Sequence, residues 1–313
     1  MKNKFFFLIL SVLFLTVTCK QNKSEPVVET TQSDSEELQS VLINGDSIHY
    51  IDVGKGEPVV FVHGGLGNYE SWAFQVDTFA TKHRVIAYSR RYAYPNNQNY
   101  SDSVDYSVVP HAKDLATLIK ILNLGPVHLV GHSWGAFTAL KATIDHPELV
   151  QSLTLGEPPV HSLIENTKIG DSLLANLELN TFEPSAQAFK QGDNENGIAL
   201  FIGGVMGDSL MYEKTSEYWR NRMQQNVLGL RGLMINHNRD FLDIKPKTVQ
   251  TIKTPVLVIK GDISPLFLRE IAIKLDSLLP NSQLFTLPNS SHGLQSSNPK
   301  VFNETVLEFI ESN

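Results

Sequence analysis

Cysteine is almost absent from the 313-residue chain: Cys19 is the only one, so no internal disulfide can form. Metal-binding patterns are missing as well, because the sequence has neither paired cysteines nor an H-E-x-x-H motif. No G-x-G-x-x-G motif follows a predicted strand, so no dinucleotide cofactor is implied. We therefore expect a protein that works without a metal or a cofactor.

Positive charge is also scarce. The chain carries 26 Lys and Arg against 33 Asp and Glu, for a formal net charge of −7. Binding of nucleic-acid phosphates needs clustered basic side chains, and no such cluster is present. The charge balance therefore argues against a nucleic-acid partner and favours a small-molecule substrate.

Long hydrophobic runs are lacking too. The apolar stretch over residues 5–15 is shorter than the roughly 20 apolar residues that a membrane-spanning helix needs. Lys2 and Lys4 give it a basic start, and small or branched residues follow it. This pattern is typical of a secretory signal, and we predict a signal peptide over residues 1–18.

Cys19 follows this segment at the position where bacterial lipoproteins carry their acylated cysteine, and the segment resembles such a signal. The resemblance implies lipidation of Cys19, secretion across the inner membrane, and a lipid-anchored protein of the cell envelope, periplasmic or at the outer membrane. The alternative is ordinary signal-peptidase cleavage beside an incidental cysteine. Residues 19–39 are polar and cannot bury enough surface to fold, so we predict a disordered tether there.

The remaining sequence alternates strand and helix patterns. Residues 47–54 alternate apolar and polar side chains, as an antiparallel strand does. Continuous apolar runs typical of buried parallel strands occur at 57–65, 83–89, 125–131, 150–156, 254–260 and 282–288. Helical periods lie between them at 107–124, 133–147 and 265–280. This order predicts an α/β fold with a mostly parallel sheet and helices on both faces.

The alternation stops between residues 158 and 250, which have the pattern of several helices. We therefore predict a core formed by residues 40–157 and 251–313, with a helical cap over 158–250. Such a cap would cover the carboxyl edge of the sheet, where open α/β sheets bind their ligands.

The motif GHSWGA (131–136) lies between a predicted strand and a predicted helix. A strand-turn-helix junction this tight needs small residues at Gly131 and Gly135, and it projects Ser133 above the sheet. The start of the helix also offers free N–H groups and a positive dipole end. Ser133 is the predicted nucleophile, and the alternative is a structural serine at a turn.

With this motif the chain resembles the α/β-hydrolase superfamily from about residue 41 to 312, in particular its capped serine hydrolases. In that family the first parallel strand ends in His-Gly, and the next residue has an amide that helps to hold an oxyanion. The matching residues here are His63, Gly64 and Gly65. The resemblance implies oxyanion donors at the amides of Gly65 and Trp134, with His63 in a structural role.

His292, in NSSHGLQ, follows the last predicted strand, where family members place their catalytic histidine. The acid that orients it remains open between two carboxylates. Asp262 follows the strand over 254–260, but the family position there is two residues later, at Ser264. Glu157 ends the preceding strand, as the acid does in some haloalkane dehalogenases. We favour Glu157 and keep Asp262 as the reserve acid.

The nucleophile separates the chain from dehalogenases and epoxide hydrolases, which attack with an aspartate. Ser133 implies an acyl-enzyme formed from a small ester, lactone, thioester or amide. One alternative is a proline-iminopeptidase-like aminopeptidase, which would need an acidic cap residue such as Glu213 or Glu217 to bind a free amino group. Another is a non-catalytic, ligand-binding member of the fold.

Two further groups of residues each have two alternative roles. Arg90 and Arg91 stand where many relatives have an Asp-Arg-Gly pattern, and we expect them to brace the scaffold rather than meet a substrate carboxylate. Cap side chains of the apolar and aromatic kind would suit either an apolar pocket or ordinary core packing. These are Met206, Met211, Tyr212, Trp219 and Met223.

Overall fold

An eight-stranded sheet forms the centre of the computed structural model, which describes residues 37–96, 98–236 and 241–313. Its strands lie in the order β1-β2-β4-β3-β5-β6-β7-β8, with β1 and β2 antiparallel to their neighbours and the other strands parallel. The strands are β1 (Gln39–Ile43), β2 (Asp46–Gly54), β3 (Pro58–Val62), β4 (Arg84–Tyr88), β5 (Val127–His132), β6 (Val150–Gly156), β7 (Val256–Gly261) and β8 (Ser282–Leu287). The predicted α/β fold is confirmed.

The two ends of the sheet differ from the prediction in detail. Strand β1 begins at Gln39, the last residue of the predicted tether, because Gln39 pairs with Tyr50 of β2. Strand β8 lies at the opposite edge and leaves residues such as Leu284 exposed, so the expectation of a fully buried strand there was wrong. Cys19 and the predicted signal peptide lie outside the described residues.

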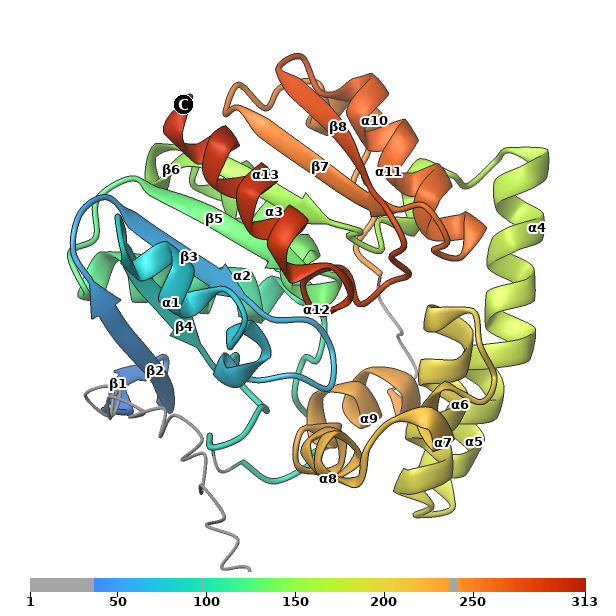
Figure 1. Cartoon of the computed structure of the whole chain (residues 1–313). Helices are drawn as coiled ribbons and strands as arrows, with labels where there is room; N and C mark the ends of the chain where they lie inside the picture. Colours follow the sequence, from blue (N-terminus) through green and yellow to red (C-terminus); the bar gives the residue numbers. More distant parts are fainter. Residues whose placement is uncertain (1–36, 97, 237–240) are drawn as a thin grey trace, which may run out of the picture. The chain divides into compact units, whose positions relative to one another are not determined.

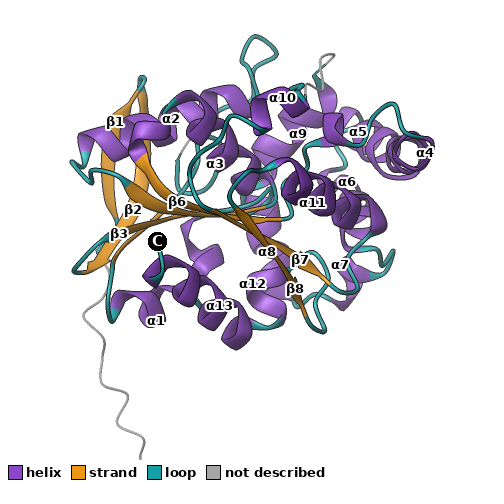
Figure 2. Ribbon diagram, turned by 90° about the horizontal axis from the view of Figure 1, so that it is seen from above, coloured by secondary structure: helices purple, strands orange, loops and turns teal. Residues whose placement is uncertain are grey.

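Helices cover both faces of the sheet, as Figure 2 shows. Helices α1 (Val76–Ala80), α12 (Leu294–Ser297) and α13 (Pro299–Glu311) pack on one face, and α2 (Val108–Ile121), α3 (Trp134–Asp145) and α11 (Leu266–Leu278) pack on the other. In the described part of the chain, no helix is both long and apolar enough to cross a membrane.

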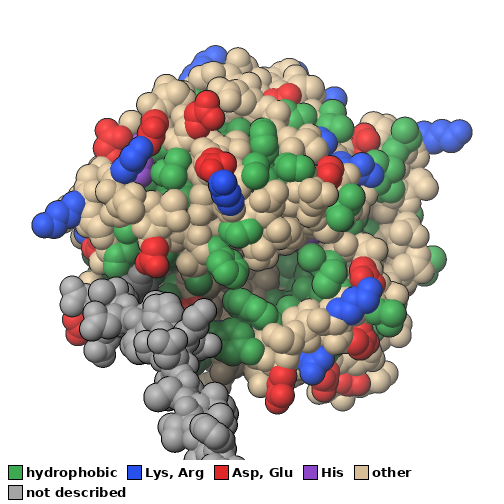
Figure 3. All heavy atoms as spheres, in the orientation of Figure 1, with side chains coloured by type: hydrophobic (Ala, Val, Ile, Leu, Met, Phe, Trp, Pro, Cys, Tyr) green, Lys and Arg blue, Asp and Glu red, His purple; other side chains and the backbone are tan. Residues whose placement is uncertain are grey.

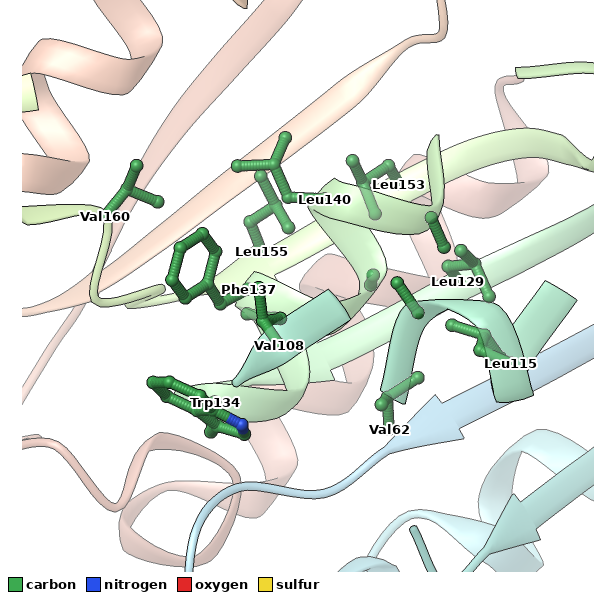
Figure 4. Packing of buried hydrophobic residues seen from close by; sticks show 14 of the residues in the cluster. Val62, Val108, Leu115, Leu129, Trp134, Phe137, Leu140, Leu153, Leu155 and Val160 are labelled. Atoms are coloured by element: carbon green, nitrogen blue, oxygen red, sulfur yellow. The ribbon is translucent and has the colours of Figure 1, made fainter. Parts of the chain in front are cut away.

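The strand pattern produces two separate cores. Along β3, Val60 and Val62 face one cluster, whereas Phe61 faces the other. Figure 4 shows strand side chains such as Leu155 packed against helix side chains such as Phe137, both fully buried. Burial of each large apolar side chain contributes about 1.5 to 3 kcal/mol to folding. The cores therefore hold the strand ends, which carry the site, in fixed positions.

Between β6 and β7, in the segment for which a cap was predicted, the described residues form helices and no strand. These are α4 (Lys168–Leu177), α5 (Glu183–Lys190), α6 (Asn194–Met206), α7 (Met211–Lys214), α8 (Glu217–Gln225), α9 (Val227–Ile235) and α10 (Pro246–Val249). Figure 1 shows α5–α9 gathered beside the ends of the parallel strands.

Local sequence signals set the limits of these cap helices. Thr167 caps α4 by accepting a hydrogen bond from the amide of Gly170, and Asp193 caps α6 in the same way. Helix α6 ends at Gly207, whose φ of 73° is a left-handed conformation that glycine adopts without strain. The cap is thus divided into short helices by its own capping residues.

Candidate active site

Ser133 lies at the tight turn between β5 and α3, with φ of 54° and ψ of −123°. A Cβ at Gly131 would lie 2.6 Å from Ala136 Cα, and one at Gly135 would lie 2.0 Å from the Val62 carbonyl oxygen. Neither position has room for a side chain, which explains the glycine on either side of the serine. The Ser133 amide donates a 2.7 Å hydrogen bond to Gly156 on β6, so the turn is anchored to the sheet.

The structure brings His292 to Ser133 although the two are 159 residues apart in the chain. The Nε2 atom of His292 lies 2.9 Å from Ser133 Oγ, and its Nδ1 lies 2.7 Å from Glu157 Oε2. Because the carboxylate can only accept, Nδ1 carries the proton and donates, which leaves Nε2 free to accept from the serine hydroxyl. The three side chains form one continuous hydrogen-bonded chain.

Glu157 is completely buried at the end of β6. Its second oxygen, Oε1, accepts a 2.9 Å bond from the Gly261 amide on β7. Burial by itself raises the pKa of the carboxyl, but the hydrogen bond and charge of His292, with smaller contributions from Ser264 and Gly261, lower that pKa below its ordinary value. The carboxylate is therefore ionised at neutral pH and held in one orientation.

Asp262, the reserve acid, lies elsewhere. Its carboxylate is exposed and accepts 2.9 Å bonds from the amides of Asn289 and Ser290, in the loop that leads to His292. These two bonds lower the pKa of Asp262. The structure thus brings Glu157, and not Asp262, to the imidazole, and it gives Asp262 the different task of supporting the histidine loop.

His132 contacts this loop as well, a role that the sequence analysis missed. Its Nε2 lies 2.6 Å from the backbone oxygen of His292 and donates to it, and the centroids of the two rings are 4.8 Å apart. Burial, followed by the nearby charge of His292, lowers the pKa of His132 to about 3, so its ring is neutral. Adjacency to Ser133 was the only signal in the sequence, and it does not reveal a contact across 160 residues.

Arg90 fixes the loop that follows β3. Its backbone amide donates to His63 Nε2 (2.9 Å), and its guanidinium donates to the carbonyl oxygens of His63 (2.9 Å) and Gly64 (2.8 Å). Since His63 Nε2 accepts, its Nδ1 carries the proton and donates to Gly64 (2.8 Å). Arg91 pairs with Asp114 of α2. These contacts agree with the bracing role expected for the arginines and with a structural role for His63, although all three residues also line the cavity.

Gly65 and Trp134 both border the cavity beside Ser133. A Cβ added at Gly65 would meet no atom within 4 Å, so the backbone there is open to the cavity. Trp134 is the first residue of α3, and N–H groups in the first turn of a helix have no partner within that helix. Gly65 and Trp134 therefore border the same cavity as Ser133, and their role as oxyanion donors stays a prediction.

The cavity itself has a volume of about 70 Å³ and lies between the sheet edge and the cap. Figure 3 shows this face of the molecule hollowed, with hydrophobic side chains on both sides of the hollow. The described residues that line the cavity include no Asp or Glu. In the part of the chain that the structure describes, no group of three or more His, Cys, Asp or Glu could hold a metal ion.

The apolar side chains that the cap contributes to this cavity are not the five for which the sequence left core packing and a pocket as alternatives. None of the five candidates lines it: Met206, Met211, Tyr212, Trp219 and Met223. Tyr212 is instead buried within the cap, and Trp219 is 40% exposed on α8. The apolar lining side chains of the cap include Phe182, Phe201, Val205, Leu230, Leu233, Met234 and Phe241. Helical spacing alone could not show which face of each cap helix meets the sheet.

Comparison with known proteins agrees with this architecture. A family model described as the alpha/beta hydrolase fold matches residues 57–299. The 2-hydroxy-6-oxo-6-(2'-aminophenyl)hexa-2,4-dienoic acid hydrolase of Metapseudomonas resinovorans is 26% identical over 92% of this chain and 96% of its own length. A bromoperoxidase from Bacillus anthracis superposes with a TM-score of 0.71 at 23% identity, covering 88% of this chain and 100% of that one. Naproxen esterase from Bacillus subtilis gives a TM-score of 0.65 at 18% identity, over 88% and 91% of the two chains.

Proposed function

The chain belongs to the α/β-hydrolase family, and from that premise we propose that it is a serine hydrolase that cleaves a small carboxylic ester or related acyl compound through an acyl-enzyme. One observation carries the proposal, namely the hydrogen-bonded chain from Ser133 through His292 to Glu157. A serine needs an adjacent base to become a nucleophile, and the base needs a third group to orient it.

In this mechanism Ser133 Oγ attacks the acyl carbon while its proton passes to His292 Nε2. The imidazolium that forms is stabilised by the Glu157 carboxylate, which accepts from Nδ1–H. The negative charge that develops on the acyl oxygen is held by the amides of Gly65 and Trp134. Each such donor is worth about 3 to 4 kcal/mol in the transition state.

The second half of the reaction uses the same groups. The tetrahedral intermediate collapses, the bond to the leaving alcohol breaks, and the alcohol takes the proton from His292 Nε2. A water molecule then gives a proton to Nε2 and attacks the acyl-serine, and the acid is released as the proton returns to Ser133. His292 therefore acts as base and acid in turn.

The cavity lining disfavours the aminopeptidase alternative. A free amino group is protonated at neutral pH, and burying it without a carboxylate partner is costly. The described lining residues contain no carboxylate, whereas Arg90 is among them. Glu213 lines a different hollow, formed by α4, α6 and the start of α11, and Glu217 is exposed on α8.

Two p-nitrophenyl esters that differ only in an amino group distinguish the esterase from the aminopeptidase. The bond that is cleaved is the same in both. We expect the p-nitrophenyl ester of hexanoate to be hydrolysed with a kcat/KM about 30- to 100-fold higher than that of 6-aminohexanoate, because the described lining residues offer no carboxylate to the ammonium. Nitrophenolate release measures both rates. A preference for the amino ester would support the aminopeptidase, and binding of either ester without turnover would support the non-catalytic alternative.

We also propose that the protein is lipid-anchored at Cys19 in the bacterial cell envelope. The support is the sequence pattern of residues 1–19, a short apolar stretch behind a basic start and ahead of the cysteine. Cys19→Ser expressed in a bacterial host should move the protein from the detergent phase to the aqueous phase in Triton X-114 partition, because each acyl CH₂ contributes about 0.8 kcal/mol to membrane binding. Unchanged partition of the variant would argue against lipidation.

A further inference from the structure

His161 is a polar side chain of the cavity that the proposed mechanism does not use. It begins the short 3₁₀ helix His161–Leu163, four residues after Glu157, and it is only 8% exposed. Its Nε2 is buried without a hydrogen-bond partner. Buried polar atoms in proteins are nearly always hydrogen-bonded, so an exception in a ligand cavity calls for an explanation.

Aromatic rings hold the imidazole in place. Phe241 stacks on it with ring centroids 4.1 Å apart and an angle of 25°, and Phe182 stacks at 6.1 Å. Phe267 meets it edge-on at 6.2 Å. His161 is therefore oriented by packing alone, which leaves its hydrogen-bonding capacity unused by these neighbours.

The imidazole lies close to the reacting centre. Phe241, which stacks on His161, also packs edge-on against Trp134 with centroids 5.4 Å apart, and Trp134 directly follows Ser133. His161 and Ser133 both line the cavity. A substrate whose acyl carbon sits at Ser133 would thus extend one of its two chains toward His161.

The charge state of His161 indicates what it can recognise. Burial lowers its pKa to about 3, so the ring is neutral and offers one N–H donor and one nitrogen acceptor. A neutral imidazole among phenylalanines cannot compensate the desolvation of a carboxylate or an ammonium group. It can satisfy a hydroxyl, keto or amide group.

An unpartnered histidine is not by itself a binding site in this protein. Both ring nitrogens of His83 are also buried without partners, yet His83 does not line the cavity. His111 does line it, and its Nδ1 also lacks a partner, but the charges of Arg90 and Arg91 act on that ring. His161 differs from both because it faces the cavity among neutral, apolar neighbours.

We propose that His161 determines substrate specificity by hydrogen-bonding an uncharged polar group, a hydroxyl, keto or amide, carried on an otherwise apolar chain of the ester. This inference rests on the proposed serine-hydrolase function. It predicts that the preferred substrates are not simple alkyl esters but esters with such a group at one defined position.

Two series of esters test the inference. The first compares p-nitrophenyl hexanoate with the 3-, 4- and 5-oxohexanoates, and the second compares the propyl and 3-hydroxypropyl esters of hexanoic acid in a pH-stat. We expect at least one polar member to exceed its apolar parent about tenfold or more in kcat/KM, because an apolar substrate leaves the buried nitrogen unpaired. In His161→Phe this ratio should fall to about one, because phenylalanine has no group that can hydrogen-bond the polar substituent.

Control variants separate recognition from structural damage. His161→Gln keeps a donor and an acceptor and should retain part of the preference, whereas His161→Leu should behave as His161→Phe does. His83→Phe should leave the preference intact. The inference is overturned if no polar ester is preferred, or if the preference survives in His161→Phe. It is also overturned if His111→Phe removes the preference and His161→Phe does not. Absence of turnover of every ester in both series by the wild-type protein would instead refute the serine-hydrolase proposal, and the inference with it.

Discussion

Replacing Ser133 with alanine is expected to lower ester turnover by about 10³- to 10⁶-fold, the largest effect of any single change in this chain. The hydroxyl oxygen is the atom that bonds to the acyl group, and no other group in the hydrogen-bonded chain can take its place. The measurement is kcat/KM for p-nitrophenyl hexanoate with purified wild-type and variant protein.

A buried serine outside the site provides the matched control. Ser185 on α5 is completely buried, and its hydroxyl donates a 2.8 Å bond to the Gly197 carbonyl within the cap. Ser185→Ala should cost some stability but leave kcat/KM within about threefold of wild type, because the bond it removes lies away from the reacting atoms. Equal turnover by wild type and Ser133→Ala, with both folded, would remove Ser133 from the mechanism.

Glu157→Gln is expected to lower kcat by about 10²- to 10⁴-fold. Glutamine keeps the shape of the side chain but carries no charge, so it stabilises the imidazolium of His292 far less than the carboxylate does. Its amide nitrogen can also face Nδ1, which would favour the wrong tautomer of the imidazole. Rates with the same ester measure the loss.

Asp262→Asn is the matched comparison, since it also exchanges one carboxylate for an amide. We expect less than about a tenfold loss, because Asp262 acts on the backbone of the histidine loop and an amide oxygen can still accept one of its two bonds. A near-normal rate in Glu157→Gln together with a collapse in Asp262→Asn would reverse the assignment of the acid.

The sequence alone could favour Glu157 over Asp262 as the acid, because strand geometry is regular. Successive residues of an extended chain point in opposite directions and advance about 3.3 Å each, so an acid two residues out of place is poorly positioned. Ser264, at the usual position of the acid, is buried, and the carboxylate that meets His292 is that of Glu157. The sequence could show that Asp262 lies two residues before the usual position of the acid. It could not show that the Asp262 carboxylate would support the loop before His292.

The contacts that the sequence did not reveal are those set by tertiary packing. His132 binds the backbone of His292, and no local pattern encodes a bond to a carbonyl so far along the chain. The lining of the cavity by Phe182 and Phe241, rather than by Met211 or Trp219, depends on how the short cap helices are turned against the sheet. The spacing of apolar residues in strands and helices, in contrast, follows directly from burial on one or two faces. This spacing placed the core elements within a few residues of their observed limits.

The central claim is that Ser133 becomes covalently acylated, and mapping of the trapped adduct tests it most directly. The folded protein would be incubated with a fluorophosphonate or quenched in acid during ester turnover, digested, and its modified peptide sequenced by mass spectrometry. We predict a single adduct on the peptide that contains GHSWGA, with the added mass on Ser133 and reduced labelling in His292→Ala. An adduct on a different residue, or none on a protein that turns over esters, would contradict the account.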